Sequence, residues 1–381
     1  MKELLKHING DRVIWVITLL LAIVSVLAVY SSVTTLAYRS HHGDATYFLI
    51  KHVIIVLVGF VLMYLSHNVK YTYYSRIFQV ATYLSFILLF FTLLRGVNEG
   101  SASRWLEIPG TGLTFQTSDF AKLALIVYVA RMISIKKDTL NDFKTGFIPI
   151  FWPIAVICGL IFPTNISTSV LLFTNCLLLM LIGGVRIKFL LFTVGTAIAG
   201  LGLFILVVFA FPHTSNRLAT AKSRIENFVE GKSSKNYQVD QAMIAIATGK
   251  PFGKGPGHSV QKNFLPQASS DFIYAILIEE YGLPMGIGIV LLYLILFYRG
   301  IRIAINNGGM FGTLLALGIS LNLILQALVN ICVAIHLLPV TGQPLPLISM
   351  GGTSIWFTCI SIGVILSVSN NSEIEKPIAA A

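Results

Sequence analysis

Three acidic residues stand in the stretch NFLPQASSDFIYAILIEEYG, residues 263–282, which is otherwise largely apolar. Asp271 lies where the longest apolar part begins, so we expect its carboxylate to be partly dehydrated and still within reach of water. Partial dehydration makes a carboxylate a stronger base, and a substrate hydroxyl can reach this position, so Asp271 is a candidate general base. Asp is also a favoured N-cap residue, and capping of the following helix is the alternative role.

Glu279 and Glu280 lie further along the same run. Glu279 is eight residues beyond Asp271, which is about 12 Å along a helix, and it lies within a quarter turn of the same face. Glu280 faces the opposite side. Acids on two faces indicate an internal polar network, so we expect both to be structural polar residues, paired with Lys122 or another buried polar group.

Several basic residues could hold an anion. They are Lys122 in FQTSDFAKLAL, Arg217 and Arg224 in NRLATAKSRIENF, and Arg104, which precedes Trp105 in SASRWLEIPG. Arginine forks match phosphate oxygens, and a partly buried lysine supplies a point charge, so the set predicts a phosphate-bearing ligand. The alternative for the two loop arginines is contact with lipid head groups.

Two segments rich in glycine and proline stand near these residues. PFGKGPG, from Pro251, lacks the spacing of a P-loop and is expected to be a turn in which glycines permit close backbone approach. LPVTGQPLPLISMGGTS, residues 338–354, is too broken for a helix and too apolar for a free loop, so we expect it to re-enter the membrane edge and line a cavity. Its Ser349, Gly351 and Gly352 are candidate substrate contacts, and Asn165 in FPTNISTS is a candidate structural polar residue.

The composition identifies the elements that must position these groups. The 381 residues are 55% hydrophobic and only 11% charged, whereas soluble domains carry about 25% charged residues. The chain is therefore expected to be an all-α polytopic membrane protein. Its net charge of +11 is spread in short clusters between apolar runs, which favours a role in topology over nucleic-acid binding. The four cysteines and eight histidines show no disulfide or metal-site spacing.

Ten apolar runs predict ten transmembrane helices, at roughly 13–34, 50–66, 77–94, 119–135, 145–163, 165–184, 187–211, 271–298, 310–335 and 353–369. The basic residues that flank them place both termini in the cytoplasm. One large extracytoplasmic loop, 211–270, then joins the seventh and eighth helices. We expect it to contain an interfacial helix, a short apolar helix, the glycine-rich turn and an extended return to the membrane.

Four motifs resemble the SEDS family (shape, elongation, division, sporulation) of polytopic peptidoglycan glycosyltransferases, which includes FtsW and RodA. They are SRWLEI; FQTSDFAK, against Q-P-S-E-x-x-K; GKPFGKGPGHSVQKNFLPQASSDFIYAILIEEYG, against G-x-G…LP…TDFIF…EELG; and LPVTGQPLPLISMGGTS, against LPxTGxxLPFxSYGGSS. The resemblance covers nearly the whole chain and implies a single SEDS-type membrane domain over residues 1–381.

The resemblance implies that the chain polymerises lipid II, an undecaprenyl-pyrophosphate-linked disaccharide pentapeptide, at the outer face of the cytoplasmic (inner) membrane. Asp271 matches the family's catalytic aspartate, which favours the base over the cap. Lys122, Trp105 and Arg217 fall where family members line the same cavity. TGQPLPLIS and the SRIENF loop are most similar to a Bacteroidetes-type FtsW, which implies a role at the division septum. An elongation-type, RodA-like polymerase is the alternative.

The sequence departs from the family pattern in places. Thr117 and Asp119 replace Pro and Glu, Met350 replaces Tyr, and Asn165 stands where Q-P-D-x-G-T usually has Asp. Since an amide exchanges no proton, we expect no proton transfer at Asn165. The partners implied by the resemblance are a class B penicillin-binding protein and other divisome proteins. No acidic cluster requires a metal, although Mg²⁺ or Mn²⁺ could assist with the pyrophosphate.

Two other classes of function are compatible with a polytopic chain. A lipid II flippase would need a polar path with a cytoplasmic entrance, whereas the polar residues of this sequence gather on the predicted outer side. A non-catalytic divisome scaffold would tolerate loss of Asp271 and keep its partners.

Overall fold

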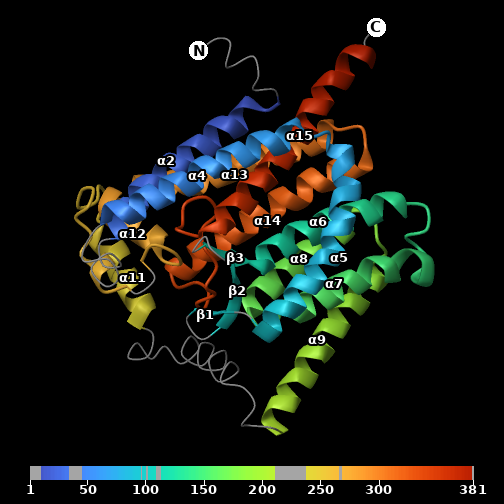
Figure 1. Cartoon of the computed structure of the whole chain (residues 1–381), viewed down its shortest axis with the longest axis horizontal. Coiled ribbons are helices and arrows are strands. Elements are labelled where there is room, and N and C mark those ends of the chain that lie inside the picture. The colour runs from blue at the N-terminus through green and yellow to red at the C-terminus, as the bar shows by residue number, and fades with distance from the viewer. Residues whose placement is uncertain are drawn as a thin grey trace.

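The computed structural model describes residues 10–33, 45–95, 97–99, 102–108, 113–210, 237–265 and 268–379. Most of its long helices lie side by side in a bundle, from which α9 (Ile187–Ala210) projects (Figure 1). In chain order they are α2 (Arg12–Ser32), α4 (Ala45–Asn68), α5 (Tyr71–Arg95), α6 (Thr117–Ile135), α7 (Ile148–Ile161), α8 (Ile166–Ile182), α9 (Ile187–Ala210), α13 (Leu283–Asn306), α14 (Met310–Ala334) and α15 (Thr353–Ala379). Two short helices, α11 (Tyr237–Thr248) and α12 (Ile273–Tyr281), precede α13.

Within the described residues, seven helical stretches are long and apolar enough to cross a membrane. They are Arg12–Ser32, Thr46–Asn68, Tyr71–Leu94, Phe143–Ile161, Leu283–Asn306, Met310–Ala334 and Thr353–Asn370. The apolar helices Ile166–Ile182 and Ile187–Gly200 are shorter. The prediction of an all-α polytopic membrane protein is confirmed at this level.

Helix α6 lies inside the bundle, packed against α5, α7, α8 and α14. Most of its side chains are buried, including those of Asp119 and Lys122 in its first turns. A helix enclosed by other helices does not face lipid, so it can hold charged groups that pair with one another. This explains why the run at 119–135 is the least apolar of those predicted.

The prediction of one continuous helix over 271–298 is wrong. Gly282, with φ +80°, separates α12 from α13, and Pro284 follows in the first turn of α13. A Cβ at Gly282 would lie 2.3 Å from the carbonyl oxygen of Pro251, so this approach of two backbones requires glycine. As a result Glu279 and Glu280 lie in α12, outside the candidate span Leu283–Asn306.

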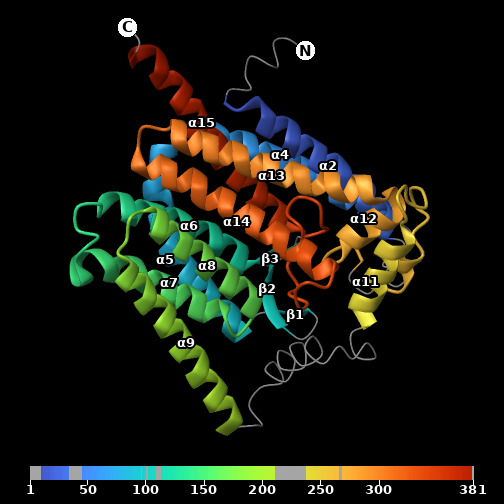
Figure 2. The ribbon, with the colours of Figure 1, turned by 180° about the vertical axis from the view of Figure 1, so that it is seen from behind.

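The bundle has two distinct ends. The start of α2 lies against the second half of α15, since a Cβ at Gly10 would be 3.1 Å from the carbonyl oxygen of Leu366. Asp11 also pairs with Arg299, near the end of α13. Helices α11 and α12 lie at the opposite end, close to the irregular segment that precedes α15, drawn in red (Figures 1 and 2).

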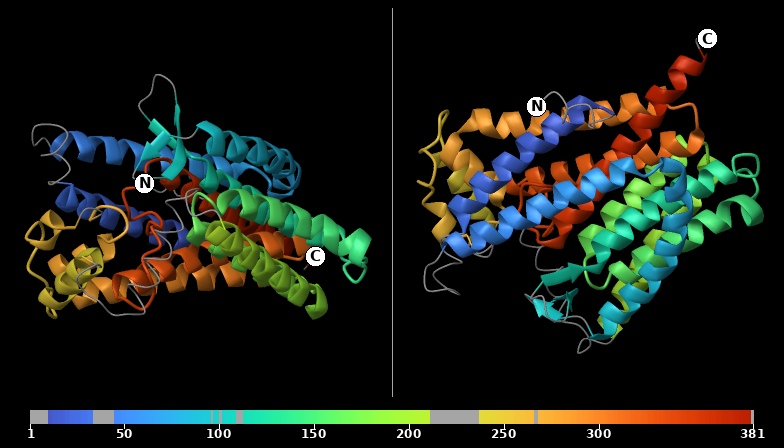
Figure 3. Two further views of the ribbon diagram at one scale, coloured as in Figure 1. Left: turned by 90° about the horizontal axis from the view of Figure 1, so that it is seen from below. Right: turned by 45° about the horizontal axis from the view of Figure 1, so that its top comes forward.

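A small antiparallel sheet, which the sequence analysis did not predict, joins α5 to α6. Its strands are β1 (Val97–Glu99), β2 (Ala102–Ile108) and β3 (Leu113–Gln116), in the order β1-β2-β3. In the β2–β3 register Trp105 lies opposite Gln116. The sheet projects from the bundle beside the irregular segment (Figure 3).

The expected extended return between PFGKGPG and the membrane is also absent from the described residues. Residues Gln261–Asn263 form a 3₁₀ turn, and residues 268–272 form further turns ahead of α12.

Candidate active site

Asp271 lies in the turn that leads into α12 and is half-buried, whereas its neighbour Phe272 is buried. The N-cap residue of α12 is Phe272, which makes no side-chain cap bond. The N-cap position of α12 thus falls one residue after Asp271.

Asn330, in the last turns of α14, holds the main chain of Asp271. Its Nδ2 donates to the carbonyl oxygen of Asp271 at 2.9 Å and to that of Gln343 at 2.7 Å. The residue is only 1% exposed. Because an amide has two N–H donors, both are used. Asn330 thus ties Asp271 to the loop 338–354.

Gln326 repeats this arrangement one turn earlier on α14. Its Nε2 donates to the carbonyl oxygen of Pro344 at 2.9 Å, and its Oε1 accepts from Lys122 Nζ at 3.4 Å. Residues four apart lie on one helix face, so α14 holds two successive loop carbonyls, those of Gln343 and Pro344. Lys122 and Asp271 are therefore bonded to the same face of α14 and flank the same stretch of loop.

The loop 338–354 is also bonded directly to the turn that carries Asp271. Ser349 Oγ donates to the carbonyl oxygen of Ser270 at 2.6 Å and accepts from Leu345 N at 2.8 Å. The Met350 amide donates to the carbonyl oxygen of Ser269 at 2.9 Å. Ser349 is buried, whereas Gly351 and Gly352 are half-buried. The hydroxyl of Ser349 is thus engaged in holding backbone in place.

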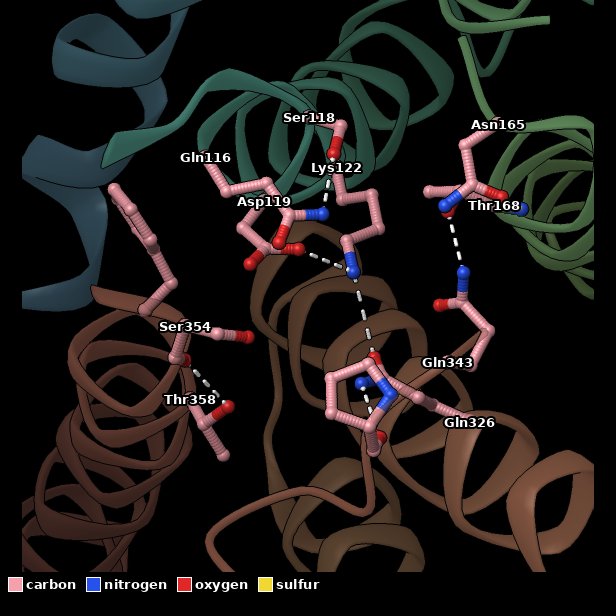
Figure 4. Close-up of polar contacts among 12 residues, drawn as sticks. Gln116, Ser118, Asp119, Lys122, Asn165, Thr168, Gln326, Gln343, Ser354 and Thr358 are labelled. Atoms are coloured by element: carbon pink, nitrogen blue, oxygen red, sulfur yellow. Dashed lines mark hydrogen bonds and ion pairs between the residues drawn. The ribbon is translucent and has the colours of Figure 1, made fainter. Parts of the chain in front are cut away.

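Lys122 pairs with a carboxylate of its own helix. Its Nζ lies 2.7 Å from Asp119 Oδ1, three residues earlier (Figure 4). The predicted pairing of Lys122 with Glu279 or Glu280 is wrong, because Asp119 already compensates its charge inside the bundle. Only part of the positive charge of Lys122 is consequently available to an anion.

A small polar cavity lies beside this ion pair. It has a volume of about 20 Å³ and is lined in part by Asp119, Asn322, Ser354 and Thr358. Among the described residues, Asp119 Oδ2 and Asn322 Oδ1 are buried without a hydrogen-bond partner. Both of these oxygens, on the cavity side of the ion pair, can therefore still accept a hydrogen bond.

Asn165 is the N-cap of α8, where its side chain accepts from the Thr168 amide at 3.2 Å. Thr168 Oγ1 in turn accepts from Gln343 Nε2 at 2.5 Å (Figure 4). The start of α8 is thereby joined to the same loop. Asn165 contributes through hydrogen bonds that need no titratable group.

The sheet lies beside the start of α15. Thr353 Oγ1 donates to the carbonyl oxygen of Thr114 at 3.1 Å and accepts from the Gln116 amide at 3.4 Å. Trp105 is half-buried on β2, opposite Gln116. Arg104 precedes it on the same strand, and its side chain lies outside the described part of the structure.

Glu279 and Glu280 belong to a polar network, as predicted, and their partners include other buried polar groups such as Ser31 and Ser259. Glu279 is paired with Lys254 at 2.6 Å. Glu280 accepts from the Ser31 hydroxyl and from the Ser259 amide. Both are almost fully buried. The network joins α12 to the PFGKGPG turn and to the end of α2.

Arg217 and Arg224 lie outside the described residues, so their predicted contact with a phosphate-bearing ligand, or with lipid head groups, stays a prediction. Where the structure describes the chain, no group of three His, Cys, Asp or Glu side chains lies close enough to hold a metal ion. These side chains do not form a metal centre by themselves.

Sequence reasoning missed Gln326, Asn330 and Gln343, which hold the loop in place. A signal was present, because buried polar residues in apolar helices are functional candidates by default, and Gln326 and Asn330 stand four apart in the apolar run of α14. Gln343 carries no comparable signal, since its partner Thr168 is far away in the sequence.

Comparison with known proteins agrees with the motifs. The family model described as cell cycle protein, for FtsW, RodA and SpoVE, matches residues 11–374. The stage V sporulation protein E of Bacillus subtilis is 31% identical over 96% of this chain and 99% of its own length. A probable peptidoglycan glycosyltransferase FtsW of Geobacter sp. strain M18 is 31% identical over 96% of this chain and 98% of its own.

Solved structures have the same fold. A chain of a peptidoglycan synthase complex, studied for its coordination of polymerization and crosslinking, superposes with a TM-score of 0.72, at 20% identity over 95% of this chain and 98% of that one. The rod shape determining protein RodA of Thermus thermophilus gives a TM-score of 0.64, at 21% identity over 95% and 97% of the two chains. With the family model and the relatives matching along almost its whole length, this chain belongs to the FtsW, RodA and SpoVE family of cell cycle proteins, the SEDS family.

Proposed function

We propose that this chain is a peptidoglycan glycosyltransferase that polymerises lipid II into glycan strands at the outer face of the cytoplasmic membrane. The relatives named as probable peptidoglycan glycosyltransferases support the activity. One observation carries the proposal: both Asp271 and Lys122 are linked to the same loop, 338–354. The links are hydrogen bonds of Gln326 and Asn330, which lie on one face of α14.

In the proposed reaction, the 4-hydroxyl of a GlcNAc attacks the anomeric carbon of a MurNAc on a second lipid II. The new C–O bond forms as the bond to the pyrophosphate oxygen breaks, with inversion, and undecaprenyl pyrophosphate leaves. Asp271 accepts the hydroxyl proton as general base. Lys122, whose charge Asp119 compensates in part, stabilises the developing pyrophosphate together with the loop residues Arg217 and Arg224.

We assign the remaining candidates by their surroundings. Trp105, Arg104, Gly351 and Gly352 contact the substrate from the sheet and from the half-buried end of the loop. Ser349 supports the Asp271 turn, since its hydroxyl is engaged with backbone groups. A Mg²⁺ or Mn²⁺ ion, if used, would be held largely by the pyrophosphate.

The proposed topology has ten spans, α2, α4 to α9 and α13 to α15, in one SEDS-type membrane domain over residues 1–381. Both termini are cytoplasmic, 211–270 is the large extracytoplasmic loop, and 338–354 is a re-entrant-like loop on the same side. The meeting of the start of α2 with the second half of α15 supports an even number of spans.

We further propose that the chain acts at the division septum of the inner membrane with a class B penicillin-binding protein and other divisome proteins. The relatives named FtsW support the division role, and the match to a chain of a peptidoglycan synthase complex supports a partner. The similarity of TGQPLPLIS to a Bacteroidetes-type FtsW stays a prediction.

The test is glycan-strand formation from labelled lipid II by the purified protein with its cognate transpeptidase. Asp271→Asn, which removes the charge at nearly constant volume, is compared with the unchanged chain. Polymer from the unchanged chain alone is the expected result. If both proteins form polymer, the chain is a glycosyltransferase but Asp271 is not its base. If neither forms polymer, the flippase or the scaffold function is favoured.

A further inference from the structure

The segment 249–257, here called the glycine turn, folds over the C-terminal end of α12. The amides of Lys254 and Gly255 donate to the carbonyl oxygens of Glu279 and Glu280, both at 2.9 Å. These are carbonyls of the last turn of α12, which have no partner inside the helix. The turn thus acts as a cap supplied by another part of the chain.

Glycines allow this contact because the two backbones nearly touch. A Cβ at Gly253, where φ is +78°, would lie 2.2 Å from the carbonyl oxygen of Glu280. A Cβ at Gly249 would lie 2.3 Å from that of Ile278. No side chain fits in these positions. Gly257 is different: its φ is +77°, yet nothing lies within 4 Å of its Cβ position.

The carboxylate of Glu279 is the centre of this junction. It is fully buried and accepts from five groups, namely Lys254 Nζ at 2.6 Å, Val260 N and Gln261 N at 3.2 Å, Thr248 Oγ1 at 3.3 Å and Ser259 Oγ. Burial raises the pKa of Glu279, but the bonds from Lys254, Ser259 and the two amides outweigh it and leave the pKa below its ordinary value. The charged form is therefore the one that this site stabilises.

Helix α12 connects this junction to Asp271. It is nine residues long, and Asp271 lies two residues before its start. Phe272, Ala275 and Ile276 of this segment are buried against Val239 and Ala242 of α11. Since a short helix is stiff, a displacement of its C-terminal end would move the turn that carries Asp271.

We infer that Glu279 is a positioning residue, which fixes Asp271 in its reactive geometry through α12 and the glycine turn without touching the substrate. This inference rests on the proposed function, with Asp271 as the base. The alternative is that the junction contributes only to stability. Misplacement of a reacting group by about 1 Å can cost about 100-fold in rate, so the two roles are separable by experiment.

The first experiment measures lipid II polymerisation by the full chain with its transpeptidase. Glu279→Gln is expected to lower kcat per folded molecule about 10- to 100-fold, with KM for lipid II within about twofold and the acidic limb of the pH profile of kcat unmoved, because the base itself is retained. Unchanged kcat per folded molecule, or a loss entirely in KM, would overturn the inference.

A matched pair of glycine variants tests the same junction. Gly253→Ala and Gly257→Ala introduce a Cβ at nearly equal positive φ, but only the first meets the backbone of α12. We expect Gly253→Ala to lower kcat like Glu279→Gln and Gly257→Ala to stay within about threefold of the unchanged chain. Equal effects of the two variants would contradict a role for the contact.

A second readout needs no polymerisation. In an Asp271→Cys chain, the rate of labelling by a membrane-impermeant maleimide reports how accessible the side chain at position 271 is to the reagent. Adding Glu279→Gln is expected to change this rate several-fold, whereas adding Gly257→Ala is not. An unchanged labelling rate would contradict the inference even if the chain is shown to polymerise lipid II. If the labelling rate changes but neither the unchanged chain nor any variant forms polymer, the effect of Glu279 on the position of residue 271 would stand and the proposed function would be overturned.

Discussion

Asp119 and Glu279 are both buried carboxylates paired with a lysine, at 2.7 Å and 2.6 Å, but their surroundings differ. Glu279 accepts from five groups, so its hydrogen-bonding capacity is used. Asp119 Oδ2 has no partner within the described part of the chain and borders a small polar cavity. A satisfied buried carboxylate holds structure, whereas one with open capacity can respond to a bound group. By this criterion the Glu279 junction is suited to support the proposed site, and the Lys122–Asp119 pair is suited to take part in it.

The largest effect is expected for Lys122→Met. Removal of the ammonium leaves Asp119 buried and unpaired, which costs about 3–5 kcal/mol of unfolding free energy. It also removes a cation from the proposed pyrophosphate site, so polymerisation should fall about 100-fold or more. Initial rates on labelled lipid II and denaturation of the purified protein in detergent would measure the two losses.

The double variant Lys122→Met, Asp119→Asn serves as the control for that prediction. It removes both charges, so most of the stability should return while activity does not. Recovery of both quantities would mean that Lys122 acts only as the counter-ion of Asp119.

A smaller loss is expected for Asn330→Ala. The carbonyl oxygens of Asp271 and Gln343 would lose their donor, at about 1–3 kcal/mol for each unsatisfied group, and the turn that carries the base would loosen. Polymerisation should fall about 10- to 100-fold. Asn322→Ala, a buried asparagine on the same helix with no bond to the Asp271 turn, should reduce the rate less. Equal losses would show that burial, not the bridge, decides the effect.

A weaker effect still is expected for Lys254→Met. Lys254 is 30% exposed, so solvent screens its pair with Glu279, and its removal should cost about 1 kcal/mol. In a double-mutant cycle of stability with Glu279→Gln, the two losses should be non-additive because the residues share one bond. Strict additivity would contradict direct coupling between them.

The smallest change in the free energy of unfolding is expected from acidification. The pKa of Glu279 is lowered in the folded state from 4.5, so its contribution to stability is present above pH 4.5 and is lost as the pH falls through the folded pKa. The difference in unfolding free energy between the unchanged chain and Glu279→Gln should therefore be constant from pH 7 to about pH 5 and shrink only below that range. A difference that already shrinks near pH 6 would mean that another group titrates in the junction.

Much of the membrane architecture could be predicted from the sequence, because an apolar run of about 20 residues indicates a transmembrane helix. It also led to Asp271 and Lys122, since polar groups at the edges of such runs stand out. The partner of Lys122 was predictable as well: Asp119 is three residues earlier, which places it on the same helix face. Of the two partners expected for the glutamates, Lys122 is wrong and other buried polar groups are confirmed.

Other features depended on contacts that the local sequence does not contain. The break at Gly282 is required by the backbone of Pro251, some thirty residues earlier, and although Pro284 is a local signal for a helix start, the contact itself is not contained in the local sequence. The bond from Gln343 to Thr168 and the sheet at 97–116 likewise arise from tertiary packing. Such long-range contacts decide where an irregular segment lies.

The pair of amides on α14 has a consequence for the conditions under which the enzyme can work. Gln326 and Asn330 hold the loop and the Asp271 turn by bonds from uncharged donors to backbone carbonyls. Such bonds neither gain nor lose protons, and added salt screens them little. In the proposed topology this end of the bundle faces the outside of the cytoplasmic membrane, where acidity and ionic strength vary more than in the cytoplasm. On the α14 side, the scaffold that holds the proposed base is therefore insensitive to both.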